Sequence, residues 1–347
     1  MRKIPSILNI SALTEKIISR ISGRSAKKIN NRIQHIKLSL KIIETIKPSY
    51  NNPWLTWYED YLKETLKLWK IVQFIPACFI PGFILRKNPE ADAAINAINK
   101  IIKNDKVICK DIMLPFQEDV KDNIFWFIVD ILFAYLLDDL DQETLNSIYL
   151  NFYEGLYEYQ TVRLEKGDIV IDAGANIGAF SALASAKGCF AYAFEPIPDI
   201  INTYLSKTAE WNPNITICKY ALSDKPGELT FNEDLSNIGG SSLVVEGKNS
   251  KKIKAQAIDL DTFAEENKLP KVDFIKADIE GAERYMLMGA KRVLKEFAPK
   301  MAICTYHLPD DPQVLRELIL DANPNYVIVE RWKKMYAYVP KKVDEKS

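Results

Sequence analysis

Residues Gly167–Phe180 read GDIVIDAGANIGAF, and this stretch decides the fold. Asp168–Ala173 is a short run rich in β-branched residues that carries an acid near its end. A glycine-bearing turn, Gly174–Gly178, follows it, and the next apolar residues recur at helical spacing. Strand, tight turn and helix in this order open a doubly wound α/β domain, whose ligand lies beyond the carboxyl end of the first strand. The stretch therefore predicts a nucleotide-like ligand.

The turn also favours one kind of nucleotide. Gly174 lets the backbone turn and approach a ligand, and Gly178 allows close packing of helix and strand. A dinucleotide fingerprint needs a second glycine where Asn176 stands, so a pyrophosphate would meet a side chain there. S-adenosylmethionine (SAM) has no phosphate. The turn therefore favours SAM over NAD.

A second acid fits this ligand. The apolar run Phe190–Phe194 ends in Glu195, 23 residues after Asp172. An acid about twenty residues beyond the glycines accepts hydrogen bonds from ribose hydroxyls. We expect Glu195 to hold the ribose, and Asp172 with the turn up to Asn176 to hold the methionine end. The alternative is that both acids only cap strand ends.

The third strand is expected over Ile215–Tyr220. The residues after it lie where such folds contact an adenine, which makes Leu222 and Asp224 candidate cofactor residues. Alternating runs between 228 and 258 predict a further β excursion. The loop Gly239–Ser242 within it could close over substrate or be a plain hairpin loop.

Two later strands end in polar residues. Val272–Ala277 is followed by three carboxylates, Asp278, Glu280 and Glu283, and Met301–Thr305 is followed by Tyr306 and His307. Carboxylates at a strand end are costly unless they are solvated, paired or used. We expect Asp278 and His307 on the same rim of the sheet as Asp172 and Glu195.

The composition is that of a soluble globular protein of two domains. The 347 residues are 48% hydrophobic and 27% charged. Five scattered cysteines without a C-x-x-C pattern predict a reducing compartment. No signal-peptide pattern is visible, and the apolar stretches 71–85 and 123–137 are too short or interrupted for membrane spans, which need about twenty apolar residues. We expect a cytoplasmic protein, and the Ile-, Asn- and Lys-rich usage suggests a bacterial one.

Residues 1–150 are expected to form a helical domain. Apolar residues recur at three- and four-residue steps over 7–21, 29–43 and 54–72, and helices are also expected at 91–102 and 122–137. Its role could be acceptor binding, dimerisation or partner docking, so a homodimer stays open. His35 lies among apolar helix positions and is expected to be a surface or satisfied histidine.

The beginning of the chain is strongly basic. Residues 1–47 hold eleven Lys or Arg against two Glu, a net charge of +9 that the remainder balances. Such a segment can contact a membrane surface peripherally or an acidic partner, or it can dock on its own acidic neighbour or be solvated. No nucleic-acid partner is expected.

The motifs together resemble a known family. They occur in the order found in FkbM-type methyltransferases, over about residues 162–340: Asp172–Gly178, Ala193–Pro196, Ala221–Asp224, Asp278–Gly281 with Glu283, and Tyr306–His307. The resemblance implies a Rossmann-like SAM-dependent methyltransferase sheet with helices on both faces over residues 151–347, preceded by the all-α N-terminal domain. It also implies methyl transfer from SAM to a hydroxyl oxygen of a natural product, sugar or glycan.

The rim residues suit this chemistry. A hydroxyl of high pKa needs its proton removed in the transition state, and His307 or Asp278 is expected to be the general base. Glu280 could orient His307 or act as a base itself. A divalent metal held by Asp278, Glu280 and His307 is the second option. Because the Asp-x-Glu spacing is short and side chains alternate faces in an extended segment, the sequence favours the base over the metal, and no metal is expected.

Two other functions stay open at this point. An NAD-dependent oxidoreductase would share the fold but needs a path for pyrophosphate at Asn176. A non-catalytic SAM-binding or scaffold protein would use the helical domain as its interaction module. Binding of S-adenosylhomocysteine (SAH) but not NAD, followed by methyl transfer, would separate the three.

Overall fold

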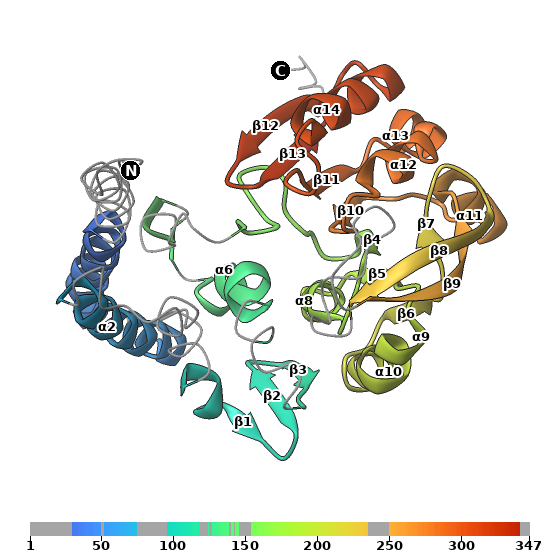
Figure 1. The fold of residues 1–347 in the computed structure, drawn as a ribbon. Helices are drawn as coiled ribbons and strands as arrows, with labels where there is room; N and C mark the ends of the chain where they lie inside the picture. The colour runs from blue at the N-terminus through green and yellow to red at the C-terminus, as the bar shows by residue number, and fades with distance from the viewer. Residues whose placement is uncertain are drawn as a thin grey trace, which may run out of the picture. The chain divides into compact units, whose positions relative to one another are not determined.

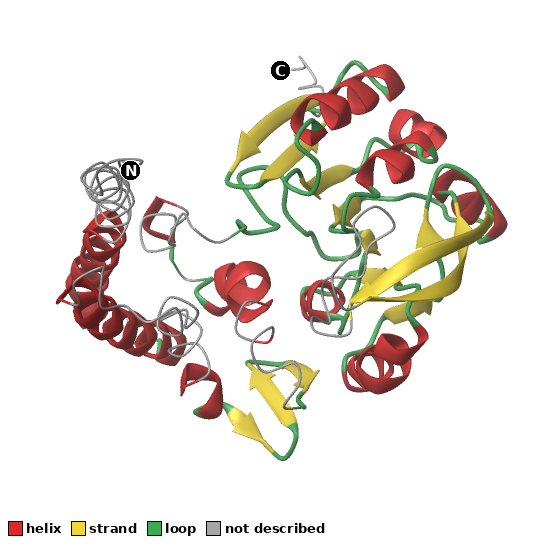
Figure 2. Ribbon diagram, in the orientation of Figure 1, coloured by secondary structure: helices red, strands yellow, loops and turns green. Residues whose placement is uncertain are grey.

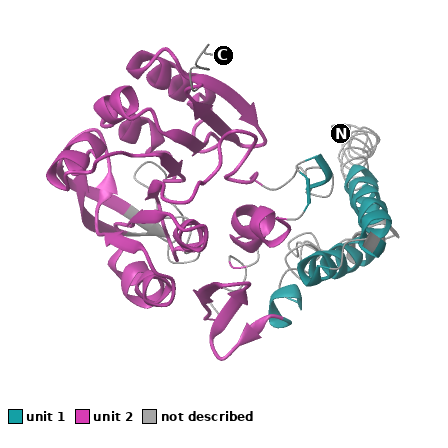
Figure 3. Ribbon diagram, turned by 180° about the vertical axis from the view of Figure 1, so that it is seen from behind, with its two compact units in different colours: residues 1–100, 139–150 teal, residues 101–138, 151–347 magenta. Residues whose placement is uncertain are grey.

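The computed structural model describes residues 30–49, 52–74, 96–117, 127–138, 154–234 and 250–340, with a few single residues between 124 and 145. The chain divides into two compact units, drawn in different colours in Figure 3. The first comprises residues 1–100 and 139–150, and the second residues 101–138 and 151–347. Residues 101–138, which the sequence places in the N-terminal domain, therefore group with the C-terminal part.

The described part of the first unit is helical. Residues 30–46 form a helix that ends at the 3₁₀ turn η1 (Lys47–Ser49), and α2 spans Pro53–Phe74. The Asn52 side chain accepts a hydrogen bond from the Trp54 amide at 2.8 Å, which satisfies a free donor at the start of α2. The buried apolar residues recur at helical spacing, as predicted, and include Ile33, Ile36, Leu40, Ile43, Leu55, Tyr58 and Leu62. The helix expected over 7–21 lies outside the described residues.

The expectation of an all-α N-terminal half is wrong for residues 102–115. They form an antiparallel three-stranded sheet of β1 (Ile102–Lys103), β2 (Lys106–Cys109) and β3 (Ile112–Pro115). Burial alternates along β2, and the turns use left-handed residues, Asn104 and Asp105 in one and Lys110 in the other. Two short helical pieces follow, the π-helix η3 (Ile128–Leu132) and α6 (Phe133–Leu136).

The second unit is built on a seven-stranded sheet, visible edge-on in Figure 1. Its order is β12-β13-β11-β10-β4-β5-β6, and β13 runs antiparallel to its neighbours. The strands are β4 (Ile169–Ala173), β5 (Phe190–Phe194), β6 (Ile215–Cys218), β10 (Phe274–Ala277), β11 (Lys300–Cys304), β12 (Val327–Arg331) and β13 (Lys334–Tyr338). The chain leaves β4 toward β5 and later returns on its other side at β10. This reversal places a ligand crevice at the carboxyl ends of β4, β5 and β10.

Helices cover both faces of this sheet, as Figure 2 shows, which confirms the predicted fold class for this part of the chain. Alternate strand residues such as Ile171 and Ile275 join the core beneath α11–α14. The opposite face packs on α8, where the rings of Phe180 and Phe274 lie 5.8 Å apart. The helices are α8 (Ala179–Ala186), α9 (Pro198–Ile200), the π-helix η4 (Ile201–Leu205), α10 (Ser206–Trp211), α11 (Leu260–Glu266), α12 (Glu283–Met288), α13 (Lys291–Glu296) and α14 (Asp311–Ala322).

The predicted β excursion is confirmed as a second small sheet. It consists of β7 (Ala221–Leu222), β8 (Gly227–Asp234) and β9 (Ser250–Ile258), in the order β7-β9-β8. The loop Gly239–Ser242 lies outside the described residues. Among the helices of the described segments, none combines the length and the apolar character that crossing a membrane requires.

Candidate active site

The turn after β4 brings two strand ends together. Gly174 has φ +74°, and a Cβ there would lie 2.0 Å from the carbonyl oxygen of Asp278. Gly178 has φ +90°, and a Cβ there would lie 2.8 Å from side-chain atoms of Leu205 and Thr208. Gly174 therefore lets the ends of β4 and β10 approach each other as well as line the crevice. Gly178 permits close packing on η4 and α10, rather than on a strand as expected.

Glu195 lies at the end of β5 with its carboxylate held by the backbone. The amides of Asn176 and Ile197 donate to its two oxygens at 3.0 and 2.9 Å. Burial raises the pKa of Glu195 to about 7, although these two amides act in the opposite direction. An ionised carboxylate has about four acceptor positions, so two amides leave capacity for hydroxyl donors. Glu195 therefore has capacity for further hydrogen-bond donors in the cavity that it lines.

Two adjoining cavities lie in front of Glu195. The first, of about 420 Å³ including space open to solvent, is lined by Gly174, Asn176, Glu195, Pro196, Ile197, Ile200, Phe231, Asp278, Ile279 and Glu280. The second, of about 280 Å³ on the same measure, is lined by Gly174, Phe194, Pro196, Tyr220, Ala221, Leu222, Phe231, Ile279 and Ala282. The two linings share Gly174, Pro196, Phe231 and Ile279, and the carboxylates line only the first, so we call the first the polar cavity and the second the apolar cavity.

The two residues predicted to contact an adenine, Leu222 and Asp224, lie in different environments in the structure. Leu222 is buried and lines the apolar cavity, as its predicted role requires. Asp224 is exposed, is absent from both cavity linings, and accepts a hydrogen bond from Ser223 at 3.1 Å. Of the two, only Leu222 lines one of these cavities.

Asp172 is fully buried and faces the protein. It accepts a hydrogen bond from Ser181 Oγ at 2.7 Å, and its other oxygen lies 3.1 Å from Lys276 Nζ. Lys276 in turn donates to the carbonyl oxygens of Ala173 and Gly174, at 3.1 and 2.6 Å. Asp172 lines neither cavity, so its visible effect is to hold, through Lys276, the turn that shapes them.

The ends of β10 and β11 bring a second set of predicted residues together around His307. Its Nδ1 lies 3.0 Å from Glu283 Oε1, and its Nε2 lies 3.5 Å from Asp278 Oδ1 and 3.6 Å from Glu280 Oε2. The amides of Ile279 and Gly281 donate to Glu283 at 2.8 and 3.0 Å, which fixes that carboxylate. We call Asp278, Glu280, Glu283 and His307 the rim cluster.

The rim cluster shifts the pKa of its members. Burial by itself would lower the pKa of His307, but the carboxylates of Glu283, Asp278 and Glu280 outweigh it and raise the pKa to about 9. Burial, and then the charge of Asp278, raises the pKa of Glu280 to about 7. Burial would raise the pKa of Asp278, yet nearby cations, Lys276 first, hold it below its ordinary value. His307 therefore holds a proton at neutral pH in the ion-free protein, while Asp278 is ionised.

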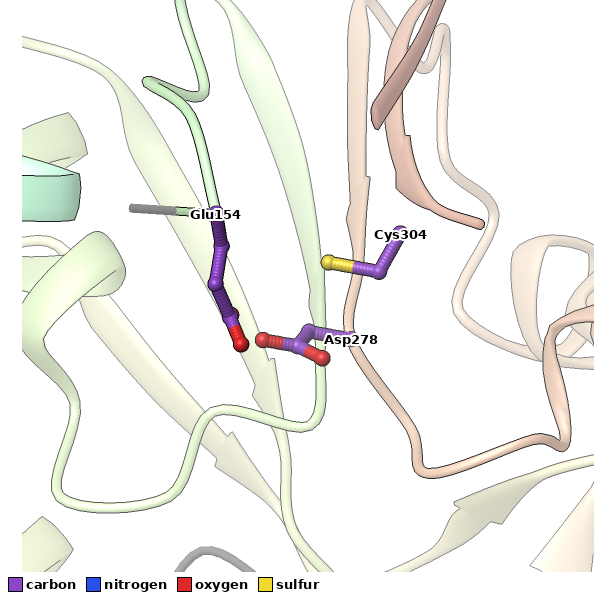
Figure 4. A group of neighbouring side chains, drawn as sticks. All are labelled: Glu154, Asp278 and Cys304. Atoms are coloured by element: carbon purple, nitrogen blue, oxygen red, sulfur yellow. The ribbon is translucent and has the colours of Figure 1, made fainter. Parts of the chain in front are cut away.

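Several residues that contact the rim cluster were missed by sequence reasoning. Tyr157 donates from its hydroxyl to Asp278 Oδ2 at 2.7 Å, and Lys334 Nζ lies 4.1 Å from the centre of the Tyr157 ring. Figure 4 shows Glu154 and Cys304 on either side of Asp278, each directed toward it. Lys276 and Lys334 could have been noticed as single lysines inside apolar strands, since a lysine is rarely buried unless it is paired.

Comparisons with known proteins agree with this geometry. Residues 172–328 match the methyltransferase FkbM domain. Over 160 residues the chain is 30% identical to the hexuronic acid methyltransferase AglP of Haloferax volcanii, a match that covers 46% of this chain and 64% of AglP. The chain thus spans less than two thirds of that relative's length.

Solved structures show similarity at lower identity. The methyltransferase FkbM of Methylobacillus flagellatus is 16% identical, with a TM-score of 0.39 and coverage of 72% of this chain and 59% of that one. A Streptococcus mutans protein solved in complex with SAH is 12% identical, with a TM-score of 0.30 and coverage of 50% and 88%. The motifs at Asp172, Glu195 and Asp278 all lie within residues 172–328, which match the methyltransferase FkbM domain.

Proposed function

We propose that this protein transfers a methyl group from SAM to a hydroxyl oxygen of a sugar or glycan. The family match supports methyl transfer, and the name of AglP, a hexuronic acid methyltransferase, supports a sugar acceptor. The observation that carries the proposal is the pair of adjoining cavities with Glu195 in the polar one and Leu222 in the apolar one. Glu195 would accept hydrogen bonds from a diol in the polar cavity, and Leu222 would contact a flat ring in the apolar cavity.

The residues fit SAM in chemical kind. The Glu195 carboxylate would accept charge-assisted hydrogen bonds from the ribose hydroxyls. Leu222 and Phe231 would contact the adenine, and the turn at Gly174 and Asn176 would lie beside the methionine end. Bound SAM supplies an electrophilic methyl group on a positively charged sulfur. The protein's remaining task is to align an acceptor oxygen with that methyl group and to assist loss of its proton.

The rim cluster is where we place the acceptor hydroxyl. Asp278 and Glu280 follow the end of β10 and line the same cavity as Glu195. Of the two expected bases, His307 carries a proton at neutral pH in the ion-free protein, which leaves Asp278 as the group able to accept one. A carboxylate of low pKa is a weak base for a hydroxyl, so this mechanism gains if the hydroxyl is made more acidic.

The first test is titration calorimetry of the full chain with SAH and, separately, with NAD. We expect micromolar SAH binding, no NAD binding, and at least about a tenfold loss of SAH affinity in Glu195→Ala, which removes the charge-assisted bonds. Unchanged SAH affinity in that variant would contradict the assignment of Glu195.

The second test is transfer of a labelled methyl group. The protein is incubated with labelled SAM and with hydroxylated acceptors, including free hexuronic acids and glycans that contain them. Transfer to a hydroxyl, located by mass spectrometry of the product, supports the proposal. Tight SAH binding without transfer to any of these or to an extract would support a non-catalytic SAM-binding protein instead, and binding of NAD would support an oxidoreductase.

A further inference from the structure

His307 is buried, and one of its ring nitrogens has no partner at hydrogen-bond distance. Its side chain is 5% exposed, Nδ1 lies 3.0 Å from Glu283 Oε1, and Nε2 and Asp278 Oδ1 lack a hydrogen-bond partner within the described residues. Buried polar atoms are usually satisfied, so each exception needs an explanation. The unsatisfied Nε2 and Asp278 Oδ1 face each other beside the polar cavity.

The distances suggest what would satisfy them. His307 Nε2 lies 3.5 Å from Asp278 Oδ1 and 3.6 Å from Glu280 Oε2, which is too long for hydrogen bonds. Two ligand atoms that bind one tetrahedral ion at about 2.0–2.2 Å lie about 3.3–3.6 Å apart. One ligand atom from each of the three residues lies within 4.8 Å of the other two. The spacing is that of neighbouring ligands around one ion.

Glu283 completes the arrangement. A histidine that binds a metal through one nitrogen usually has a carboxylate or carbonyl at its other nitrogen, which fixes the ring and its tautomer. Glu283 Oε1 lies 3.0 Å from His307 Nδ1, and two backbone amides hold Glu283 in place. The Nε2 atom is thereby directed toward Asp278 and Glu280.

The local charge also calls for a cation. The side chains that act on Asp278 and Glu280 include the carboxylates of Glu154 and Glu283 and the ammonium groups of Lys276 and Lys334. Four carboxylates thus stand against two lysines. A divalent cation bound there would offset this excess of negative charge.

We propose that Asp278, Glu280 and His307 bind a divalent transition-metal ion of the zinc type, with an open position toward the polar cavity. One imidazole and two carboxylates are ligands that suit such ions, and three protein ligands leave a fourth position for water or substrate. An ion there would lower the pKa of a bound acceptor hydroxyl, so that its proton could pass to water from the polar cavity, and Asp278 and His307 would act as ligands rather than as bases. This role rests on the proposed methyl transfer, whereas ion binding itself does not.

A neighbouring group, Glu154, Asp278 and Cys304, is a weaker candidate (Figure 4). Its position is already occupied by the Tyr157 hydroxyl, which donates to Asp278 Oδ2 and lies 3.5 Å from Cys304 Sγ. Burial raises the pKa of the Cys304 thiol well above its ordinary value, so the thiolate needed for binding is costly to form. We therefore assign the ion to the rim cluster.

The test is titration of the EDTA-dialysed full chain with Zn²⁺ by calorimetry and with Co²⁺ by visible absorption. We expect a single site and the intense absorption bands of tetrahedral Co²⁺. His307→Gln should abolish binding at this site, and Glu283→Gln, which changes only the positioning contact, should weaken it about 10- to 100-fold.

Two variants serve as controls. His35→Gln replaces the other histidine, which is exposed in the helix of residues 30–46, and should leave ion binding unchanged. Cys304→Ser should also leave it unchanged, whereas loss of binding in this variant would move the ion to Glu154 and Cys304 and overturn the assignment. Equal binding by His307→Gln and the wild type, or no binding at all, would overturn it too.

SAH binding is measured on the same ion-free samples, which keeps the two proposals apart. SAH binding without ion binding would leave the proposed cofactor intact and reject the metal site. Ion binding without SAH binding would support the metal site and reject SAM as the cofactor. His307→Gln that retains SAH affinity shows that the variant is folded, so that its loss of ion binding can be attributed to the missing ligand.

Discussion

Two groups of acids lie at the same edge of the sheet and differ in how they are satisfied. At the end of β5, Glu195 already accepts two backbone amides. At the ends of β10 and β11, Asp278 and His307 have buried polar atoms that no protein hydrogen bond satisfies in the described residues. A carboxylate fixed by the backbone is suited to hold a ligand in one position, whereas an unsatisfied cluster is suited to exchange protons or bind an ion. This difference is the basis on which we propose that Glu195 binds the cofactor and the rim cluster takes part in the chemistry.

A substitution at Gly174 is expected to disrupt the Glu195 pocket and the rim cluster at the same time. Gly174→Ala would place a methyl group 2.0 Å from the Asp278 carbonyl oxygen, at a φ of +74° that alanine disfavours. We expect a loss of about 2–4 kcal/mol in unfolding free energy, measured with urea, together with loss of both SAH binding and turnover.

Gly167→Ala is the matched control for this variant. Its φ of +87° imposes a similar backbone strain, but nothing lies within 4 Å of the added Cβ. We expect a cost of about 1 kcal/mol and normal SAH binding. Equal effects of the two substitutions would show that strain alone, and not the approach of β4 to β10, makes Gly174 necessary.

His307→Ala should lower the catalytic rate without changing SAH binding at Glu195. We expect kcat to fall by about 100-fold or more, because the acceptor hydroxyl loses the group that prepares it for deprotonation, while the Kd of SAH changes by less than about threefold. Steady-state kinetics and calorimetry on the same preparation measure the two effects. Retained turnover would remove His307 from the mechanism, and a parallel loss of SAH affinity would show that the two groups are not independent.

Glu195 should make cofactor binding depend on pH. Its pKa of about 7 means that it gains its charge between pH 6 and 8, and the charged form accepts the stronger hydrogen bonds. We expect SAH affinity to rise up to about tenfold over this range, measured by calorimetry, with a flatter profile in Glu195→Gln. A wild-type profile as flat as that of the variant would contradict a role for this charge.

The raised pKa of Glu195 also makes the stability of the folded protein depend on pH. The pKa of Glu195 is raised in the folded protein from an ordinary value of 4.5. Its contribution to stability is therefore fully present below about pH 4.5 and is lost as pH rises through about 7. Glu195→Gln should remove this part of the pH dependence of the urea midpoint.

The sequence was sufficient to predict which residues meet at the sheet edge. Glu195, Asp278 and His307 each follow a short apolar run, and the carboxyl ends of parallel strands meet at one edge, so their proximity follows from the fold. Tyr157 could not be found in this way. It precedes the sheet, shows no strand or helix period, and reaches Asp278 across 121 residues of sequence.

Two differences between the sequence-based expectations and the structure have physical causes. Residues 102–115 form strands of two to four residues, too short for an alternating pattern to stand out beside helical neighbours. Asp172 was expected to face the ligand because it ends a strand, but side chains alternate along a strand, and its face is the one that packs on α8 and Ser181. Strand-end position predicts the edge of the sheet and leaves the direction of the side chain open.

Tyr157 offers the finest test of the comparison, because its hydroxyl donates to Asp278 of the rim cluster. Tyr157→Phe removes one hydrogen bond to Asp278 Oδ2 and keeps the ring beside Lys334. A hydrogen bond to a charged group contributes about 1.5–3 kcal/mol in general, and solvent from the cavity can replace part of it, so we expect kcat to fall about three- to tenfold. SAH affinity should stay unchanged, because Glu195 has its own partners. Tyr204→Phe, which removes a hydroxyl on η4 away from the cavity linings, is the control. A fall in SAH affinity in Tyr157→Phe alone would mean that the rim cluster and the Glu195 pocket adjust to each other, and that binding and chemistry share one rigid edge.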